Sequence, residues 1–277
     1  MATTDDDHPH HAGLAHDLQI LTRRQMIRMA ARAAAGFAVM PVLASCGTSD
    51  GATPDGGSDN GDGASGNAAC AKIPEETAGP YPGDGSNGAN ALALSGIVRG
   101  DIRSSIAGAT GVAQGVVLTV SLTLVSSGTC TPLADHAVYL WHCDRDGNYS
   151  MYSAAVIGEN YLRGVQVSDA AGLVTFTSIF PGCYAGRWPH IHFEIYPTVA
   201  AATSGSGKVA TSQLALPKST CDVVYATAGY AASVANLSRI TLASDNVFSD
   251  GATLQLPSIT GTVEQGYAAA LTVAIAG

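Results

Sequence analysis

Two observations in the sequence predict an all-β fold, namely a β-sandwich. The first is a series of short segments in which apolar and polar residues alternate, most clearly residues 116–125, which read V-V-L-T-V-S-L-T-L-V. Alternate side chains of a strand share one face, so this period of two indicates a half-buried strand. The second is the set of turn signals between such segments, for example D-R-D-G-N at residues 144–148. Many short strands joined by glycine-rich turns are typical of sandwiches and barrels.

In chain order, the alternating or continuously apolar segments give the expected strands. They lie at residues 93–99, 116–125, 137–142, 174–179, 190–196, 238–242 and 270–276. One short helix is expected at residues 229–237. The sequence contains no internal repeat.

The first 46 residues have the features of an export signal. A twin-arginine pair, Arg23 and Arg24, precedes a weakly apolar stretch over residues 29–44, which is too short and too polar to cross a bilayer. The stretch leads into Leu-Ala-Ser-Cys, which resembles a lipoprotein cleavage box with Cys46 as the acylated residue. The alternative is a chance cysteine after an ordinary signal.

Residues 47–69 are rich in Gly, Ser, Asp and Asn, and we expect a disordered linker because they hold too little apolar surface to order themselves. The folded domain is expected over residues 70–277. It would be exported, and either anchored to a membrane only through a lipid on Cys46 or secreted. With 13 basic and 22 acidic residues, a net charge of −9, the chain lacks the clustered cations that a nucleic-acid partner requires.

Beyond Cys46 the cysteines are odd in number. They are Cys70, Cys130, Cys143, Cys183 and Cys221. Outside the cytoplasm an odd number leaves one thiol free or pairs it between chains. We expect two disulfides whose pairing the spacing does not decide, with Cys183 a candidate for the unpaired thiol.

The most informative stretch is residues 180–193, F-P-G-C-Y-A-G-R-W-P-H-I-H-F. In a strand, His190 and His192 project to the same face, so both imidazoles can meet one metal ion. Tyr184 and Arg187 lie just before them. A histidine pair at this spacing also occurs as surface polarity or as a satisfied core pair, so the spacing alone leaves the metal site open.

Several further motifs occur in the order found in one family. They are E-T-A-G-P-Y at residues 76–81, W-H-C-D at 141–144, G-N-Y at 147–149, L-R-G at 162–164 and S-Q-L at 212–214. Over residues 75–225 the chain resembles the intradiol ring-cleavage dioxygenases, which include the catechol and protocatechuate dioxygenases. Each motif is weak alone. Their order, together with the tyrosine and the H-I-H-F block, carries the resemblance.

The resemblance implies a β-sandwich enzyme with a non-haem ferric ion held by Tyr149, Tyr184, His190 and His192. Phenolate oxygens suit Fe(III), a hard and highly charged ion, and imidazoles fill the remaining positions. The resemblance also implies a catalytic role for Tyr149, although the sequence does not decide which of the two tyrosinates the substrate displaces.

Two further residues are implied in binding and turnover of the substrate. Arg187 matches an arginine that stabilises negative charge on the substrate ring, and Gln213 matches a glutamine that lines the substrate and oxygen pocket. The structural alternatives are a salt bridge for Arg187, an ordinary strand residue for Gln213 and turn packing for Tyr149.

The implied reaction is cleavage of a small aromatic diol of the catechol type by O2, between the two hydroxyl-bearing carbons, to a muconate-type diacid. The chain departs from the family in two respects. Only five residues separate Tyr184 from His190, fewer than in the well-known members, and the helical dimerisation segment of the catechol enzymes has no counterpart. The identity of the substrate therefore does not carry over.

Two alternatives of other classes stay open. One is a catalytically silent β-sandwich module that binds carbohydrate or aromatic ligands at a cell surface. The other is a copper or zinc site on His190 and His192. The sequence does not decide whether the protein is a homo-oligomer.

Overall fold

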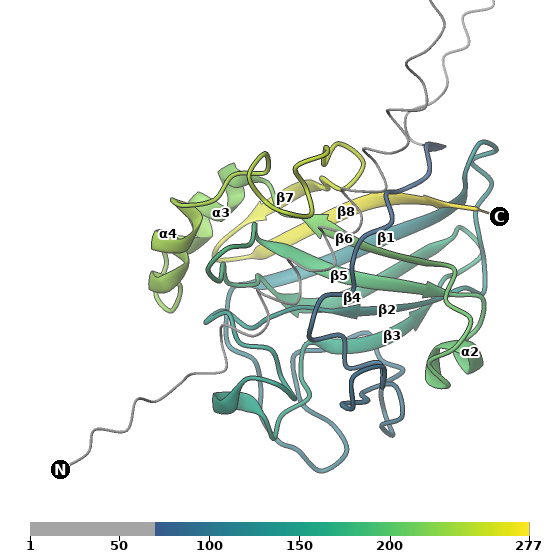
Figure 1. Ribbon diagram of the computed structural model, residues 1–277, viewed down its shortest axis with the longest axis horizontal. Coiled ribbons are helices and arrows are strands. Elements are labelled where there is room, and N and C mark those ends of the chain that lie inside the picture. The colour runs from purple at the N-terminus through teal and green to yellow at the C-terminus, as the bar shows by residue number, and fades with distance from the viewer. Residues whose placement is uncertain (1–69, 277) are drawn as a thin grey trace, which may run out of the picture.

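The computed structural model describes residues 70–276, which form two four-stranded sheets (Figure 1). The strands are β1 (Val117–Ser126), β2 (Ala137–Trp141), β3 (Arg163–Val167), β4 (Leu173–Ile179), β5 (His190–Tyr196), β6 (Ala210–Ala215), β7 (Ser258–Thr262) and β8 (Gly266–Ile275). The first sheet has the order β4-β1-β8-β7 and the second the order β3-β2-β5-β6. The all-β sandwich predicted from the sequence is confirmed. The predicted export signal, its Cys46 and the linker over residues 47–69 lie outside the described residues.

Short helices lie at the ends of the sandwich. They are η3 (Ala154–Val156, a 3-10 turn), α2 (Val199–Thr203), α3 (Lys218–Tyr225) and α4 (Ala231–Leu237). In Figure 1, α3 and α4 pack together at one end of the sheets and α2 lies at the other. Among residues 70–276, no helix is long and apolar enough to cross a membrane. The helix expected at 229–237 is confirmed as α4.

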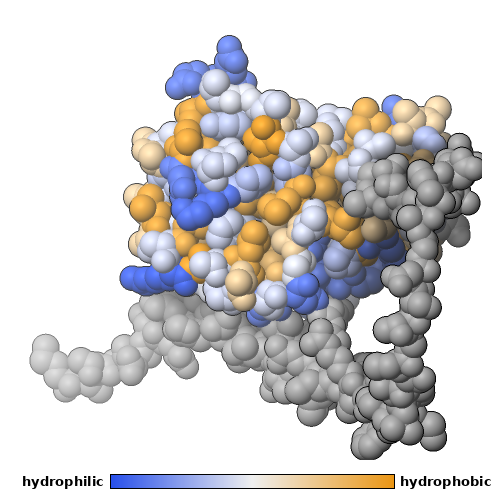
Figure 2. Space-filling view, turned by 90° about the horizontal axis from the view of Figure 1, so that it is seen from above, coloured by the Kyte–Doolittle hydropathy of each residue, from blue (hydrophilic) through white to orange (hydrophobic). Residues whose placement is uncertain are grey.

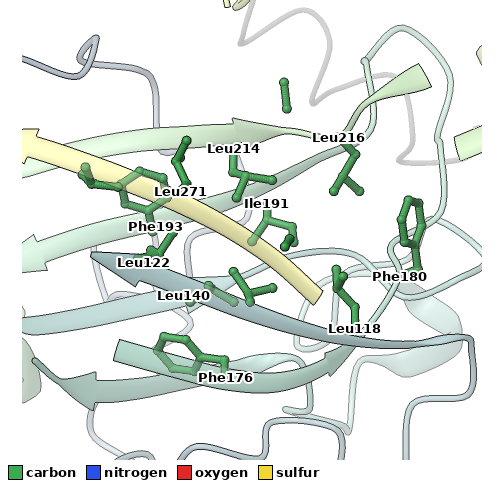
Figure 3. Close-up of a cluster of buried hydrophobic side chains, with 14 of the residues drawn as sticks. Leu118, Leu122, Leu140, Phe176, Phe180, Ile191, Phe193, Leu214, Leu216 and Leu271 are labelled. Carbon is green, nitrogen blue, oxygen red and sulfur yellow. The ribbon is translucent and has the colours of Figure 1, made fainter. Parts of the chain in front are cut away.

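The core between the sheets is built from the apolar sides of the strands. In β1 the side chains at alternate positions, including Leu118 and Leu122, are fully buried and the intervening ones face outward. Figure 3 shows them packed against Leu140 of β2, Phe176 of β4 and Phe193 of β5. Each such side chain contributes about 1.5–3 kcal/mol by leaving water.

The second sheet is buried on both faces, because every residue of β2, β5 and β6 is buried. One face joins the core between the sheets, and the other is covered by the segment over residues 73–99, which we call the covering segment. Its backbone bonds to both edges of the sheet: Glu76 N donates to Thr211 O of β6, and Arg99 N donates to Val165 O of β3. Figure 1 shows this segment, in dark blue, crossing β5, β2 and β3. Polar side chains on that face of the sheet are therefore enclosed.

The exterior mixes residue types. On the face shown in Figure 2, apolar side chains are interspersed with polar ones over the described part of the chain. Several valines are about half exposed, among them Val112, Val223 and Val234. Singly exposed apolar side chains of this kind are normal on a folded domain.

Two predicted strands are wrong. Residues 93–99 form successive turns, in which Leu94 N donates to Ala91 O and Ile97 N to Leu94 O, and Gly96 takes a left-handed conformation with φ of 89°. Residues 238–242 continue the turns at the end of α4. In both places the apolar side chains pack onto a neighbouring layer without forming a strand, because local hydrogen bonds already satisfy much of the backbone.

The disulfide prediction is partly wrong. Among the described residues, Cys70 and Cys130 form a disulfide, with their Cα atoms 5.3 Å apart, and the other three cysteines are free and buried. Only one of the two expected bridges is present, and Cys183 is free as expected. Burial raises the pKa of the Cys183 thiol to about 12, so the side chain behaves as a small apolar group in the core.

Candidate metal centre

Two tyrosines and two histidines converge on the covered face of the second sheet. His190 and His192 are alternate residues of β5, Tyr149 follows β2, and Tyr184 follows β4. His190 Nε2 lies 3.3 Å from Tyr149 Oη, 3.2 Å from Tyr184 Oη and 3.1 Å from His192 Nε2. Tyr184 is partly exposed, and the other three side chains are buried. The structure thus brings together all four side chains that the resemblance singled out.

The spacing of these four side chains fits a shared ion. Two donor atoms that each lie about 2.1 Å from one ion, at roughly 90–110° to each other, are about 3.0–3.4 Å apart. All three distances from His190 Nε2 lie in this range. Two phenols and two imidazoles also form a donor set of oxygen and nitrogen that suits a hard trivalent ion. The residues present therefore fit ferric iron.

The tyrosines are needed for this site. Among residues 70–276, no group of three or more His, Cys, Asp or Glu side chains is arranged to hold a metal ion. A zinc or copper ion on His190 and His192 alone would have only two of the protein ligands that such ions usually take. The arrangement favours an ion that accepts phenolate oxygens.

Each imidazole is oriented by a different contact. His190 Nδ1 lies 2.5 Å from Trp188 O, so it donates to that carbonyl and its Nε2 lone pair faces the cluster. The His192 ring stacks on Trp141, with centroids 4.9 Å apart and planes 5° apart. On the opposite side the covering segment approaches closely, because a Cβ on Gly79 would lie 3.4 Å from His192 Cε1. Gly79 has a φ of 70°, which also favours glycine.

Burial sets the protonation of the cluster. It lowers the pKa of His190 and of His192 well below the usual value, so both imidazoles are neutral and able to act as ligands at neutral pH. Burial, and then the neighbouring Tyr184, raise the pKa of Tyr149 well above that of a free phenol. The Tyr149 phenol therefore holds its proton until a cation replaces it.

Arg187 and Gln213 lie beside the cluster and contact each other. Arg187 Nη2 donates to Gln213 Oε1 at 2.7 Å, and Arg187 Nε donates to Asp245 Oδ2 at 3.0 Å. Burial alone would lower the pKa of Arg187, but Tyr184 and Asp245 outweigh it and raise the pKa. The salt bridge weighed as the alternative for Arg187 is present. Arg187 nevertheless belongs to the site, because the same guanidinium also interacts electrostatically with Tyr184.

Gln213 links three parts of the site. It pairs with His192 in the register of β5 and β6, and its Nε2 donates to Thr77 O of the covering segment at 2.8 Å. With its Oε1 bound to Arg187, both ends of the fully buried amide are engaged. Gln213 is therefore more than an ordinary strand residue, since it holds both the arginine and the covering segment.

Arg163 is a residue whose role the sequence did not reveal, although it lies in the L-R-G motif. Its guanidinium is fully buried and donates to Tyr81 O, Pro82 O, Tyr139 Oη and both the hydroxyl and the carbonyl of Ser150. These bonds fix the residue that follows Tyr149 and the part of the covering segment that bears Tyr81. The Tyr81 ring lies 4.9 Å from the Tyr149 ring, so Arg163 holds both aromatic neighbours in place.

His142 lies close to Tyr149 in sequence, but its side chain is engaged elsewhere. Its Nδ1 is 2.7 Å from Cys143 O and its Nε2 is 2.7 Å from Ser178 Oγ. Burial lowers the pKa of His142 to about 4. The unfolded chain, with a histidine pKa of about 6.5, therefore binds more protons than the folded state between these pH values.

Stability should consequently fall as the pH drops from about 6.5 towards 4, and His142 should account for part of the fall. In the metal-free protein, the loss of unfolding free energy between pH 7 and pH 4.5 should be about 2–3 kcal/mol smaller for His142→Gln than for the wild type. Urea unfolding at the two pH values measures this difference. Equal losses in both proteins would show that His142 is not buried in its neutral form.

Comparison with known proteins agrees with the geometry. A family model described as Dioxygenase matches residues 101–202. A solved intradiol ring-cleavage dioxygenase from Tetranychus urticae aligns with a TM-score of 0.58 and 27% identity, covering 75% of this chain and 95% of its own. A search of curated protein sequences finds no match.

Two further solved structures align less closely. The dioxygenase domain of a carbohydrate-binding fusion protein from Streptomyces sp. SirexAA-E has 21% identity, a TM-score of 0.46 and coverage of 74% of this chain and 98% of its own. Catechol 1,2-dioxygenase from Pseudomonas arvilla C-1 has 20% identity, a TM-score of 0.45 and coverage of 74% and 62%.

The fold and the cluster define a β-sandwich protein with an oxygen- and nitrogen-donor site on one sheet. The family match over residues 101–202 and the Tetranychus urticae structure make the chain similar to the intradiol ring-cleavage dioxygenases, the family that its motifs resemble.

Proposed function

We propose that this protein is a non-haem Fe(III)-dependent dioxygenase that cleaves a catechol-type aromatic with O2, between the two hydroxyl-bearing carbons, to a muconate-type diacid. The observation that carries the proposal is that two phenol oxygens and the Nε2 of a second imidazole each lie 3.1–3.3 Å from His190 Nε2. The similarity to the Tetranychus urticae dioxygenase supports it.

Tyr149, Tyr184, His190 and His192 would hold the ion. When bound, ferric iron supplies Lewis acidity, which activates the ring of a bound catechol towards dioxygen. The two phenolates would offset two of its three positive charges, and the neutral imidazoles would add none. The ligand set therefore favours the ferric state over the ferrous state.

Tyr149 is suited to take a proton from the substrate. A catechol must lose its hydroxyl protons to bind as a dianion, and a group with a high pKa close to the site can accept one of them. Burial raises the pKa of the Tyr149 phenol well above its usual value, so Tyr149 Oη would hold such a proton firmly.

Arg187 supplies a fixed positive charge. It is buried and bonded at both Nε and Nη2, so its position does not depend on the substrate. A preorganised cation of this kind stabilises negative charge that develops on a substrate ring without reorganising during the reaction. The covering segment, whose Tyr81 ring lies 4.9 Å from the Tyr149 ring, covers the same region.

The proposal is tested by supplying the purified protein with Fe(III) and a panel of catechols while oxygen uptake and the ultraviolet absorption of the diacid are followed. We expect uptake of one O2 per diacid formed. Tight binding of catechols or carbohydrates without oxygen uptake would instead favour a silent binding module. A protein that takes up zinc or copper in preference to iron would favour the third alternative.

We also propose that the protein is exported and anchored through a lipid on Cys46. The twin arginines and the Leu-Ala-Ser-Cys box support this, as does the Cys70–Cys130 disulfide, because disulfides persist mainly in oxidising compartments. Cys46→Ser should move the protein from the membrane fraction to the soluble fraction on cell fractionation. Retention of the variant in the membrane fraction would refute acylation at Cys46.

A further inference from the structure

A buried carboxylate in the C-terminal part of the chain, that of Asp245, contacts Arg187 and Trp188 beside the candidate site. Asp245 lies after α4, in a turn that its own side chain closes, because its Oδ1 accepts from Val247 N at 2.8 Å and from Phe248 N at 3.1 Å. The residue is fully buried. Its second oxygen, Oδ2, points away from this turn and accepts from Arg187 Nε at 3.0 Å and from Trp188 N at 2.7 Å.

These two bonds reach the site by separate routes. The first fixes the guanidinium of Arg187, which Gln213 holds on its other side. The second fixes the backbone of Trp188, whose carbonyl accepts from His190 Nδ1 and so sets the direction of the His190 Nε2 lone pair. One carboxylate therefore supports both the cation beside the site and one of its imidazoles.

The charge of Asp245 is needed as well as its shape. Arg187 is 3% exposed, and a buried guanidinium without a counter-ion is costly. Among residues 70–276, Asp245 makes the one salt bridge to Arg187. Its turn lies beyond both residues 101–202, where the family model matches, and residues 75–225, where the motifs occur. Asp245 thus adds a contact to the site from a part of the chain beyond the motifs.

We propose that Asp245 is a positioning residue for this site, which holds Arg187 in place to act on the substrate. The proposal rests on the function proposed above. It assigns to Asp245 no contact with substrate or metal, and it predicts that the larger part of the effect of removing its charge passes through Arg187 and the rest through Trp188 and His190.

A double-mutant cycle tests this. The four iron-loaded proteins are the wild type, Asp245→Asn, Arg187→Met and the double variant. Binding is measured without oxygen as the dissociation constant of 4-nitrocatechol, from the change in visible absorption, and kcat/KM is measured with catechol. Asp169→Asn is the matched control, since Asp169 closes a turn by accepting from Ala171 N and Leu173 N but contacts no arginine in the described part of the chain.

Asp245→Asn should weaken 4-nitrocatechol binding and lower kcat/KM, each by about 10–100-fold. In the Arg187→Met background the same substitution should change either quantity by less than about fivefold, the part that passes through Trp188 and His190, and Asp169→Asn should leave both unchanged. Equal effects of Asp245→Asn in both backgrounds, or no effect in the wild type, would overturn the proposal. If Asp245→Asn alone is too unstable to assay, a loss of more than about fivefold from Arg187→Met to the double variant overturns it and a smaller loss supports it.

The proposed function and the role of Asp245 can be refuted separately. A wild-type protein that binds neither iron nor 4-nitrocatechol would refute the proposed function, and the role of Asp245 with it. A wild type that binds and cleaves catechols, but whose Asp245→Asn variant behaves like Asp169→Asn, would refute the role of Asp245 alone.

Discussion

Replacing Tyr184 by phenylalanine should remove most of the visible absorption of the iron-loaded protein and lower kcat/KM by at least roughly 100-fold. Phenolate bound to Fe(III) absorbs visible light by charge transfer, and phenylalanine lacks the oxygen. Changes to residues that only support metal ligands already cost about 10–100-fold, so loss of a ligand should cost at least as much. The visible spectrum and steady-state oxygen uptake measure the two effects.

Tyr196→Phe is the matched control. Tyr196 lies on β5, the strand that carries both histidines, but its hydroxyl donates to Glu194 Oε2 at 2.6 Å, away from the cluster. The same chemical change there should leave the absorption band and kcat/KM nearly unchanged. A Tyr184→Phe protein that keeps the visible spectrum of the wild type would contradict the assignment of Tyr184 as a ligand.

Arg163→Met should lower the free energy of unfolding by about 3–5 kcal/mol. The substitution leaves the carbonyls of Tyr81 and Ser150 without the donor they now share, whereas Pro82 O keeps the bond from Tyr139 Oη. A buried polar group left unpaired costs about 1–3 kcal/mol. Loss of the buried positive charge offsets part of this cost. Urea unfolding of the metal-free protein measures the change.

Arg103→Met is the control for this prediction. Arg103 pairs with Asp101 at 2.7 Å, but both side chains are at least a third exposed, so we expect a loss below about 1 kcal/mol. Arg163→Met should also weaken iron binding, because the backbone beside Tyr149 is released, whereas Arg103→Met should not. Equal losses of stability in the two variants would show that Arg163 does not hold the covering segment to the sheet.

The sequence predicted the sandwich where a strand carries its own signal. Residues 116–125 alternate because one face of β1 meets the core, and β5 could be predicted at residues 190–196 because Ile191, Phe193 and Ile195 stand at alternate positions. Strand β7 has mostly exposed residues and no apolar pattern, so only its pairing with β8 defines it. Residues 93–99 have a strand-like composition, but Gly96 and local hydrogen bonds make turns there.

The residues of the candidate site were also only partly predictable from the sequence. The spacing of His190 and His192 placed both on one face of a strand, whereas Tyr149 and Tyr184 joined them as expected ligands only through the resemblance of their motifs to the dioxygenase family. Asp245 and Arg163 could not be given roles, because their contacts join segments far apart in the chain: Asp245 lies 58 residues after Arg187 and Arg163 lies 82 after Tyr81. Single-sequence patterns report local periodicity and do not report which distant buried charges meet.

Anomalous diffraction at the iron absorption edge, from crystals of the iron-loaded protein, would locate a ferric ion relative to the four side chains. We expect a single iron peak about 2.0–2.3 Å from the phenolate oxygens of Tyr149 and Tyr184 and from Nε2 of His190 and His192. An iron peak elsewhere, or one held by the two histidines with both tyrosines turned away, would contradict this expectation.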